Sequence, residues 1–595
     1  MCGICGERRL DGSPSAPGLI ERMLAAVARR GPDGQGIHRG DSLVLGHRRL
    51  AVIDPSARAH QPMVDGDLVL VFNGTLYNFR ELRGRLQALG HRFVSEGDSE
   101  VILKAYRAWG DRCVEHLHGE FAFAIWDGNA QRLLCARDRM GIKPFYYAAD
   151  GRSFRFASNL DALLAAGGID TRIDPVALHH QFTLHGVVPA PATVLRGVRK
   201  LPPAHCLVLE RDGRHILRRY WQLDARREAV ERDEQAWADA MHAALRDAVV
   251  SRHRVSDVPV GVLLSGGLDS SLLVALLAEA GVADLQTFAI GFADQPEEKG
   301  DEFEFSDLVA ARYRTLHRRV VVPDDQLLVR LPQAVDAMAE PMFGHDAVAF
   351  FLLAERVAES LKVVQCGQGA DEVFAGYAWY ARMRDDRSGS RLTRFGRHYF
   401  DREQAEFLSM TTSAFDVGDP TAALVEARLD DALSETFIDA VLKLDVTTLV
   451  VDDPVKRIDN MTMAWGLEAR VPFLDQRVVE LAARCPPSLK LASGGKHLLK
   501  RIARGRVPDA VIDRPKGYFP VPAIKYLRGD LLDFVRSVLD SRACRERGLF
   551  ERRYIDRLLA APAMHHTRIM GNKLWQIALF EYWMQRHVDR CVAAA

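Results

Sequence analysis

The feature that most constrains the fold is an uncharged run, VPVGVLL (258–264), which passes through a glycine-rich turn into the apolar segment LLVALLAEAG (272–281). A short, fully apolar run followed by such a turn is typical of a buried strand in a parallel sheet. Two later segments, LQTFAIGF and LKVVQCGQGADE, repeat the pattern of a strand followed by a turn. We therefore predict a doubly wound α/β domain whose strand ends carry ligand-binding loops.

The turn after the first of these strands has the composition of a phosphate-binding loop. Glycines let a phosphate approach the backbone, and free N–H groups at a helix N-terminus attract anions. A carboxylate repels phosphate unless a cation lies between them, so Asp269 predicts a bridging Mg²⁺. A glycine-rich turn with a capping aspartate is the simpler alternative. The candidate nucleotide-binding residues here are Ser265, Gly266, Gly267, Asp269, Ser270 and Ser271.

A second acidic turn, GQGADE, places Asp371 shortly after Gly367 and Gly369. Two carboxylates from two strand ends would suit a clamp for Mg²⁺ and pyrophosphate, whereas this turn alone could be a helix cap. Further on, Lys496 or Lys516 could neutralise charge that develops on a phosphate during adenylyl transfer. Most lysines are solvated surface charges, so neither lysine is assigned by this argument alone.

The chain divides into two regions of different character. Residues 1–215 alternate short strands, such as LVLVFNG and FAFAIWD, with helical patches such as SEVILKAYRAWG, which favours a layered α+β domain. A highly charged stretch follows, and we place the linker near residues 222–235. The α/β pattern comes next, and the chain becomes mostly helical after residue 380. We expect one domain over residues 2–215 and a second over residues 235–595.

Composition excludes several classes of protein. Lys+Arg and Asp+Glu both number 79, so no global field attracts the chain to nucleic acid or to a membrane. No uncharged apolar run reaches the roughly 18 residues of a membrane-spanning helix, and the N-terminus lacks the apolar core of a signal peptide. The cysteines are scattered and odd in number, which suits free thiols in a reducing compartment. We expect a cytoplasmic multidomain enzyme.

The N-terminal stretch MCGICG raises a separate question, because Cys2 directly follows the initiator methionine. Removal of that methionine would leave a thiol and a free α-amine on one residue. Such an amine has an unperturbed pKa of about 7.7–8.0 and can act as the general base for its own nucleophile. A metal site would need two ligands besides Cys2 and Cys5, and a redox C-x-x-C should open a helix after a strand. A buried structural cysteine is the remaining alternative.

Other residues of the same region suit an acyl-transfer site. FNGTLYN offers Asn73 and the backbone N–H of Gly74 as oxyanion donors. Arg49 in GHRRLAVID can form a bidentate contact with an α-carboxylate, and Asp98 in SEGDSEVI can hold an α-ammonium group. A thiol for the amide, a cation for the carboxylate and an anion for the ammonium group together describe a site for free glutamine.

Seven motifs in order, MCGICG, RRGPDG, GHRRLAVID, FNGTLYNF, GDSEV, SGGLDSS and LEARVPFLD, resemble class II glutamine amidotransferases of the asparagine synthetase family over residues 2–530. The SGGLDSS loop is similar to the pyrophosphate loop of the ATP-pyrophosphatase family. The resemblance implies an N-terminal-nucleophile αββα glutaminase domain joined to an α/β ATP-pyrophosphatase-like synthetase domain with a helical C-terminal part. It also implies ATP and Mg²⁺ as cofactors, with glutamine and a carboxylate acceptor, a small peptide or an amino acid, as substrates.

The resemblance further implies a role for each candidate residue. In the first domain Cys2 would be the nucleophile, Asn73 and Gly74 the oxyanion hole, and Arg49 and Asp98 the contacts to glutamine. In the second domain the implied residues are Asp269 and Asp371 for Mg²⁺ and pyrophosphate, Lys496 for the intermediate, and the backbone around Leu264, Ile290 and Gly367 for the nucleotide.

Two departures from the family pattern bear on the substrates, one at the acceptor and one on the glutamine side. Asparagine synthetases usually have Ser-Gly-Glu-Gly before the second acidic turn, and this chain has Gln368 in place of that glutamate. Thr75 likewise replaces the usual glutamate after Gly74. Together with DDPVKRIDNMTMAWG and IDRPKGYFPVP, these departures resemble the N-acetylglutaminylglutamine amidotransferases, which amidate a blocked dipeptide that serves as a bacterial osmoprotectant.

The predicted function is a glutamine-hydrolysing, ATP-dependent amidotransferase. Ammonia released at Cys2 would travel through a shielded passage to a carboxylate activated as its adenylate, and would displace AMP. Asparagine synthetase acting on aspartate is the nearest alternative, and a β-lactam synthetase-type ring closer would have no use for Cys2. A tRNA-modifying enzyme of the pyrophosphatase type should carry a basic domain, and a non-catalytic scaffold should have lost some of the candidate residues.

Three questions stay open at the level of sequence. Candidate acceptor contacts are His345, Asp346, Arg457, Asp459 and Trp465, each of which could equally be structural. The oligomeric state is undetermined, with a homodimer as one candidate. Residues 540–595 suggest no function.

Overall fold

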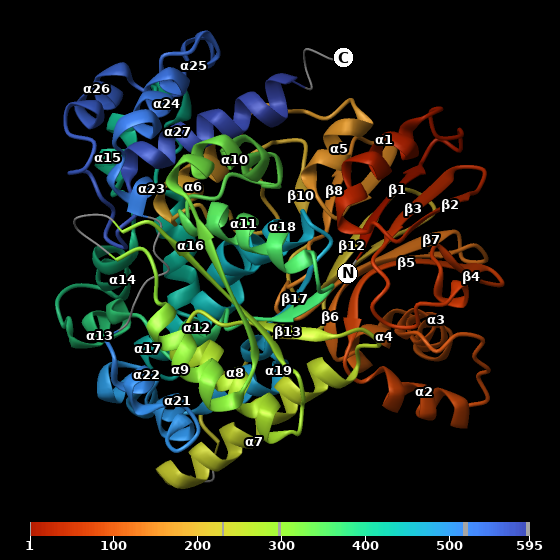
Figure 1. Ribbon diagram of the computed structural model, residues 1–595. Helices are drawn as coiled ribbons and strands as arrows, with labels where there is room; N and C mark the ends of the chain where they lie inside the picture. The colour runs from red at the N-terminus through yellow and green to blue at the C-terminus, as the bar shows by residue number, and fades with distance from the viewer. Residues whose placement is uncertain (1, 229–230, 295–298, 516–521, 591–595) are drawn as a thin grey trace.

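The computed structural model describes residues 2–228, 231–294, 299–515 and 522–590. Its N-terminal part holds two six-stranded antiparallel sheets (Figure 1). The first sheet has the order β10 (Arg199–Lys200), β8 (Tyr146–Ala149), β9 (Ser153–Ala157), β1 (Gly3–Arg9), β3 (Leu43–Arg49) and β2 (Gly34–Arg39). The second sheet has the order β12 (His215–Arg219), β11 (His205–Leu209), β7 (Arg132–Arg137), β6 (Gly119–Asp127), β5 (Leu68–Leu76) and β4 (Met63–Asp65).

The two sheets bury one face against each other and the other face under helices. Ile4, Val71, Leu133 and Phe156 belong to one buried apolar cluster that both sheets contribute to. Because side chains alternate between the faces of a strand, the opposite faces need their own cover. Helices α1 (Leu19–Ala26) and α5 (Leu160–Ala166) cover the first sheet, and α2 (Phe79–Ala88) and α3 (Asp98–Trp109) pack beside the second. This arrangement confirms the predicted αββα domain.

The second part of the chain is built on a five-stranded parallel sheet. Its order is β15 (Leu316–Val322), β14 (Gln286–Phe292), β13 (Val260–Leu263), β16 (Val363–Gln365) and β17 (Glu468–Arg470). The chain leaves β13 toward one edge and returns to its other side at β16, and ligands bind at such reversals of strand order, beyond the carboxyl ends of the strands. The SGGLDSS loop follows β13 into α8 (Leu268–Glu279), and the second acidic turn follows β16 into α12 (Ala370–Val373). Both predicted loops therefore meet at this reversal.

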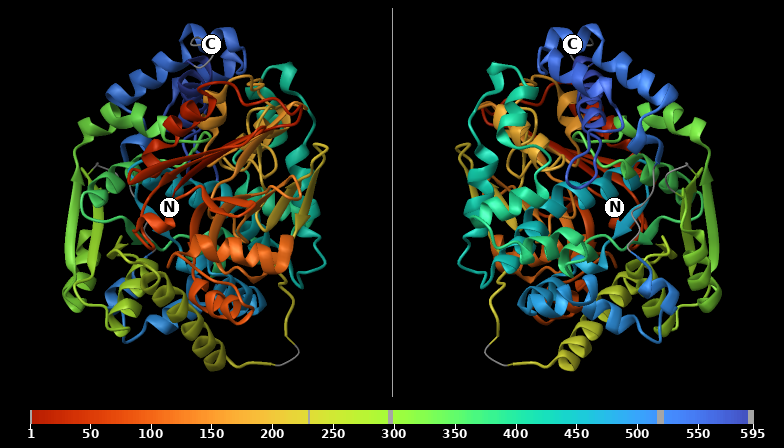
Figure 2. Two further views of the ribbon diagram at one scale, coloured as in Figure 1. Left: turned by 90° about the vertical axis from the view of Figure 1, so that its right-hand side faces the viewer. Right: turned by 90° about the vertical axis from the view of Figure 1, so that its left-hand side faces the viewer.

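Several strands were not predicted from the sequence, and for three of them the reason is clear. Strand β15 forms the outer edge of the parallel sheet (Figure 2), and its sequence LHRRVVV is largely exposed, so it lacks an alternating pattern. Strand β17 has three residues, too few for any periodicity. Strand β1 has the sequence GICGERR, in which two glycines and three charged residues surround Ile4 and Cys5, so its preference for a strand is weak.

The C-terminal segment packs against both parts of the molecule. Helix α27 (Lys573–Met584) lies across the top of the views in Figures 1 and 2, and Trp583 donates from its indole nitrogen to the carbonyl of Met338 at 2.8 Å. Just beyond it, His587 contacts Asp161 of α5 through Nδ1 at 2.6 Å. Residues 540–590, for which the sequence suggested no role, therefore connect the second domain to the first. Among the described residues, no helix is long and apolar enough to cross a bilayer.

The His587 contact predicts a pH-dependent stability. Burial disfavours the imidazolium, but Asp161 and the carbonyl of Val335, 2.9 Å from Nε2, outweigh it and raise the pKa of His587. A raised pKa stabilises the fold fully below the unfolded value of about 6.5, and the stabilisation is lost as pH rises through the folded value. We expect His587→Gln to lower the free energy of unfolding by about 1–3 kcal/mol at pH 6 and by much less at pH 9. Thermal unfolding measured from pH 6 to pH 9 tests this prediction. The control is His215→Gln, which replaces an exposed histidine on β12. Equal losses of unfolding free energy in His587→Gln at both pH values would contradict it.

Candidate functional site

Cys2 lies immediately before strand β1, where two neighbouring side chains hold its backbone. The backbone nitrogen of Cys2 donates to Oδ1 of Asn73 at 2.9 Å, and Nε of Arg30 donates to its carbonyl at 3.2 Å. Asn73 lies on β5 and is fully buried, and its Nδ2 has no hydrogen-bond partner among the described residues. A buried amide donor without a partner costs free energy unless a ligand uses it. The predicted oxyanion donor is thus placed beside the predicted nucleophile.

Cys2 and Cys5 do not form a joint site. Cys5 belongs to the buried cluster that includes Ile20 and Leu24 of α1, whereas Ile4 lies between the two sheets. Alternation along the strand therefore points Cys2 and Cys5 to opposite faces. Burial raises the pKa of the Cys5 thiol far above its usual value, and the described residues contain no cluster of three or more acidic, histidine or cysteine side chains arranged to hold a metal.

A small cavity of about 30 Å³ adjoins Cys2. Arg49 and Asp98, the predicted contacts to glutamine, both line it, together with Gly74 and Thr75. The guanidinium of Arg49 also donates to the carbonyls of residues 54 and 56, which fixes its direction. Burial raises the pKa of Asp98 to about 6, and this carboxylate accepts from the backbone N–H of Leu76 at 3.0 Å. The Cys2 thiol and the two residues predicted to contact glutamine therefore share one cavity.

Glu468, which sequence analysis did not single out, also lines this cavity although it belongs to β17 of the second domain. Its carboxylate accepts from Nε of Arg470 at 2.6 Å and from the hydroxyl of Thr75 at 3.0 Å. Burial opposes its ionisation, but Arg470 outweighs that effect and lowers the pKa of Glu468. The only sequence signal was its position inside LEARVPFLD, which gives no indication of a contact so far along the chain.

The reversal of strand order in the parallel sheet holds a larger cavity of about 450 Å³. Loops after β13, β14 and β16 supply its walls. The predicted residues that line it are Ser265, Gly267, Asp269, Ser270, Ile290, Gly367, Asp371 and Lys496. Leu264, Gly266 and Ser271 lie outside the lining, and the backbone N–H of Leu264 donates to the carbonyl of Phe288.

Lys496 sits between the two predicted acidic residues. Its Nζ lies 2.5 Å from Oδ2 of Asp269 and 2.8 Å from Oδ1 of Asp371. Burial opposes its charge, but the two carboxylates outweigh burial and raise the pKa of Lys496. Gly376 permits this approach, because a Cβ there would lie 2.1 Å from Oδ1 of Asp371 and 2.3 Å from Cε of Lys496. The other candidate, Lys516, lies outside the described residues.

Both aspartates can reach one cation, since a single ammonium already contacts both of them. Hard oxygen ligands beside a phosphate-binding loop are the donor set that Mg²⁺ prefers. Asp269 and Asp371 therefore fit a Mg²⁺ ion bound together with phosphate oxygens. An ion pair that sequence analysis missed, Arg514 to Glu302 at 2.9 Å, also lines this cavity.

The candidate acceptor contacts separate into two groups. Gln368 and Asp346 line the larger cavity, and Arg457 lies 3.2 Å from the carboxylate of Asp346. Asp459 instead forms a buried bidentate pair with Arg30, at 2.9 and 3.2 Å. Neither His345 nor Trp465 is among the residues that line the larger cavity. Because Arg30 also donates to the carbonyl of Cys2, Asp459 connects the second domain to the residue predicted as the nucleophile.

Each half of the chain matches a known protein family. Residues 240–585 match the family described as Asparagine synthase, and residues 1–221 match the family described as Glutamine amidotransferase domain. Glutamine-hydrolyzing asparagine synthetases 3 and 1 of Bacillus subtilis are 31% and 29% identical to this chain; the alignments cover 94% and 99% of it and 93% and 97% of those relatives. Asparagine synthetase B of Escherichia coli is 27% identical, over 87% of this chain and 82% of its own.

The fold, its two cavities and these matches define a two-domain, ATP-dependent carbon–nitrogen ligase with glutamine as the nitrogen donor. The N-terminal domain has the architecture of an N-terminal-nucleophile glutaminase. The chain belongs to the asparagine synthetase family.

Proposed function

We propose that this protein amidates N-acetylglutaminylglutamine with ammonia taken from glutamine, and consumes ATP to AMP and pyrophosphate. Ammonia is released in the first domain and used in the second. The choice of acceptor rests on one observation, the neutral side chain of Gln368 in the wall of the larger cavity. Asparagine synthetases usually have a carboxylate at this position.

Cys2 acts as the nucleophile of the glutaminase half-reaction in this proposal. Burial raises the pKa of its thiol, so the resting thiol is protonated and needs a base. Once the methionine is removed, the nitrogen that Asn73 Oδ1 now accepts from becomes a free α-amine, held next to the thiol it would deprotonate. The thiol adds to the glutamine amide, and Nδ2 of Asn73 with the N–H of Gly74 donates to the developing oxyanion.

Lys496 and the two aspartates serve the adenylation half-reaction. Mg²⁺, when bound with ATP, would offset charge on the pyrophosphate that leaves. Asp269 and Asp371 would hold that ion, while Ser265 and the backbone of the SGGLDSS loop bind phosphate oxygens. Lys496, buried and charged, donates to the transferring phosphate, where its positive charge stabilises the transition state.

Ammonia must pass from Cys2 to the adenylate without contact with bulk water, since near pH 7 water would protonate it. Two contacts support a closed junction between the two halves: Arg30 with Asp459, and Glu468 with Thr75, all buried. Strand β17, which carries Glu468, pairs with β16, whose end leads into the second acidic turn. The small cavity beside Cys2, which we call the glutamine cavity, and the larger cavity are therefore attached to adjacent strands.

The acceptor follows from the charges of the larger cavity. Aspartate carries an α-ammonium group that needs an anionic partner, whereas a dipeptide with an acetylated N-terminus does not. Gln368 supplies no such anion, and the nearby carboxylate of Asp346 is engaged by Arg457 at 3.2 Å. Aspartate stays the second candidate, because the relatives that align over most of the chain are named asparagine synthetases.

The test compares acceptors in glutamine-dependent pyrophosphate release. We expect kcat/KM for N-acetylglutaminylglutamine to exceed that for aspartate by about tenfold or more, because an unpartnered buried charge costs at least about 1–3 kcal/mol. Unacetylated glutaminylglutamine separates the effect of the blocked N-terminus from that of peptide length. Gln368→Glu should shift the preference toward acceptors with a free ammonium group. A higher kcat/KM for aspartate in the unmodified enzyme would establish asparagine synthesis instead.

A further inference from the structure

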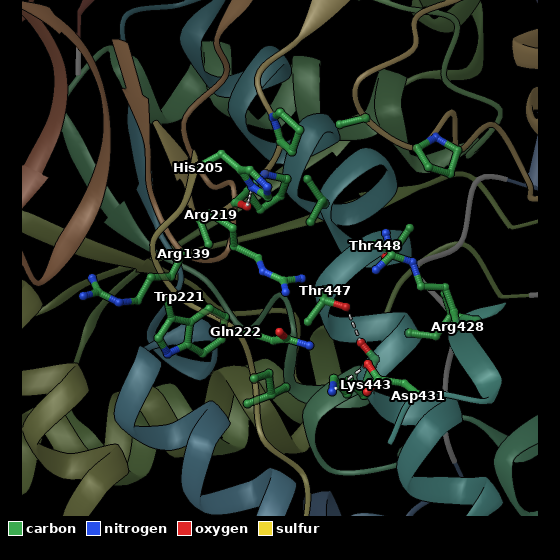
Figure 3. Close-up of a pocket in the computed structure, with 18 of the residues that line it drawn as sticks. Arg139, His205, Arg219, Trp221, Gln222, Arg428, Asp431, Lys443, Thr447 and Thr448 are labelled. Atoms are coloured by element: carbon green, nitrogen blue, oxygen red, sulfur yellow. Dashed lines mark hydrogen bonds and ion pairs between the residues drawn. The ribbon is translucent and has the colours of Figure 1, made fainter. Parts of the chain in front are cut away.

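A third cavity, of about 250 Å³, lies where the two domains and the segment between them meet (Figure 3). The hairpin β11–β12 forms one side, helix α16 (Pro420–Leu429) and the π-helical turn Asp445–Leu449 form the other, and residues 221–223 lie between them. Pro203, Leu444 and Val451 give it an apolar wall. None of its residues lines the glutamine cavity or the larger cavity.

Two exposed arginines line this cavity without a direct ion pair in the described part of the chain. In Figure 3 the guanidinium groups of Arg219 and Arg428 approach its centre from opposite sides, above the amide of Gln222. Within the described part of the chain, neither forms a salt bridge or a side-chain hydrogen bond. Arg139 differs, because its guanidinium points away and donates to the carbonyls of residues 115 and 117.

The other charges around the cavity are compensated. Lys443 pairs with Asp431 at 2.8 Å, and Asp452 pairs with Lys200 at 3.0 Å. Burial is the main cause of a lowered pKa at His205, and Arg219 and Arg428 lower it further. Arg428 also helps Lys443 to lower the pKa of Asp431, but the lining still holds more arginine and lysine side chains than carboxylates, so the cavity is net positive.

We propose that this cavity binds a small organic dianion, a dicarboxylate or a phosphate monoester, held between Arg219 and Arg428. Each guanidinium offers a planar fork that matches a carboxylate or phosphate group. Gln222 and Thr448 offer further hydrogen bonds, and the apolar wall accommodates a short carbon skeleton.

Occupation of this site would link the domains. Arg219 belongs to β12 of the glutaminase sheet, and Arg428 to a helix of the synthetase domain. The π-helical turns beside the cavity continue into α18 (Lys456–Met463), which carries Asp459, the partner of Arg30, and Arg457, the partner of Asp346. A bound dianion would therefore lie beside turns that lead into a helix paired with Arg30, which holds the Cys2 carbonyl, and with Asp346, which lines the larger cavity.

The experiment measures binding rather than turnover. Isothermal calorimetry of the full chain uses succinate as the dicarboxylate and glycerol phosphate as the phosphate monoester, with acetate at equal ionic strength as the monoanion. Arg219→Gln and Arg428→Gln each remove one guanidinium, and Arg214→Gln removes an exposed arginine in the hairpin turn, outside the cavity, as the matched control. Thermal unfolding without ligand verifies that each variant is folded.

We expect saturable binding of at least one dianion, a dissociation constant raised about tenfold or more in each cavity variant, and no change in Arg214→Gln. Whether succinate or glycerol phosphate binds identifies the chemistry of the ligand. Equal affinity for acetate, binding that survives both cavity substitutions, or no saturable binding of either dianion would overturn the proposal.

Discussion

Cys2→Ala is expected to abolish glutamine-dependent amidation while leaving ammonia-dependent amidation intact. The substitution removes the sulfur that would attack the amide, and loss of a catalytic nucleophile lowers kcat by roughly 10⁴-fold or more. The larger cavity lies in the other domain and keeps all of its residues. Glutamate formation from glutamine and pyrophosphate release with ammonium chloride, measured on the same preparation, separate the two half-reactions.

Cys5→Ala is the matched control for this experiment. Cys5 lies three residues further on, within strand β1, is fully buried, and is directed to the opposite face of the sheet. It should retain glutamine-dependent activity. If Cys2→Ala still used glutamine, or if Cys5→Ala lost it equally in a folded protein, Cys2 would not be the nucleophile.

Lys496→Met should impair the synthetase half-reaction and spare the glutaminase half-reaction, the reverse of Cys2→Ala. It is expected to lower pyrophosphate release by about 10²–10³-fold or more with either nitrogen donor, since a preorganised charge at the transferring phosphate is lost. Cys2, Asn73 and Arg49 are untouched, so glutamate formation from glutamine should persist. The two aspartates would also lose their shared counter-ion and repel each other, which weakens the site beyond the loss of one donor.

Lys362→Met provides the control for Lys496→Met, because Lys362 is a partly exposed lysine that pairs with Asp33 away from the larger cavity. It should behave as the unmodified enzyme does. Retention of pyrophosphate release in Lys496→Met, with ammonium chloride as donor, would remove Lys496 from the adenylation step.

Local pattern was enough to predict much of this architecture. The buried strand and loop before Asp269 and the acidic turn at Asp371 were predicted from short segments, because strand burial and glycine turns leave signals within about ten residues. Strands β15 and β17 were not, because an exposed edge and a three-residue strand carry no period. Lys496 was one of two candidate lysines, and its contacts with both aspartates are visible only in the folded chain.

Other features of the site depend on segments far apart in the sequence. Thr75 and Glu468 are separated by 393 positions, and Arg30 and Asp459 by 429. Neither pair belongs to one helix, strand or turn, so no periodicity or spacing relates its members. Arg219 and Arg428, which line one cavity without a direct ion pair, are a similar case, since each alone has the sequence context of an ordinary surface arginine.

The sequence by itself determined the two-domain architecture, the glycine-rich loops after two parallel strands and the placement of Cys2 ahead of a strand, because each of these is encoded by neighbouring residues. The tertiary structure decided which side chains share a cavity. It placed Glu468 of the second domain in the glutamine cavity and turned Cys5 away from Cys2. It also brought both aspartates to one lysine. The physical reason is that burial pairs charges and donors across the folded chain, where leaving them unpaired would cost free energy.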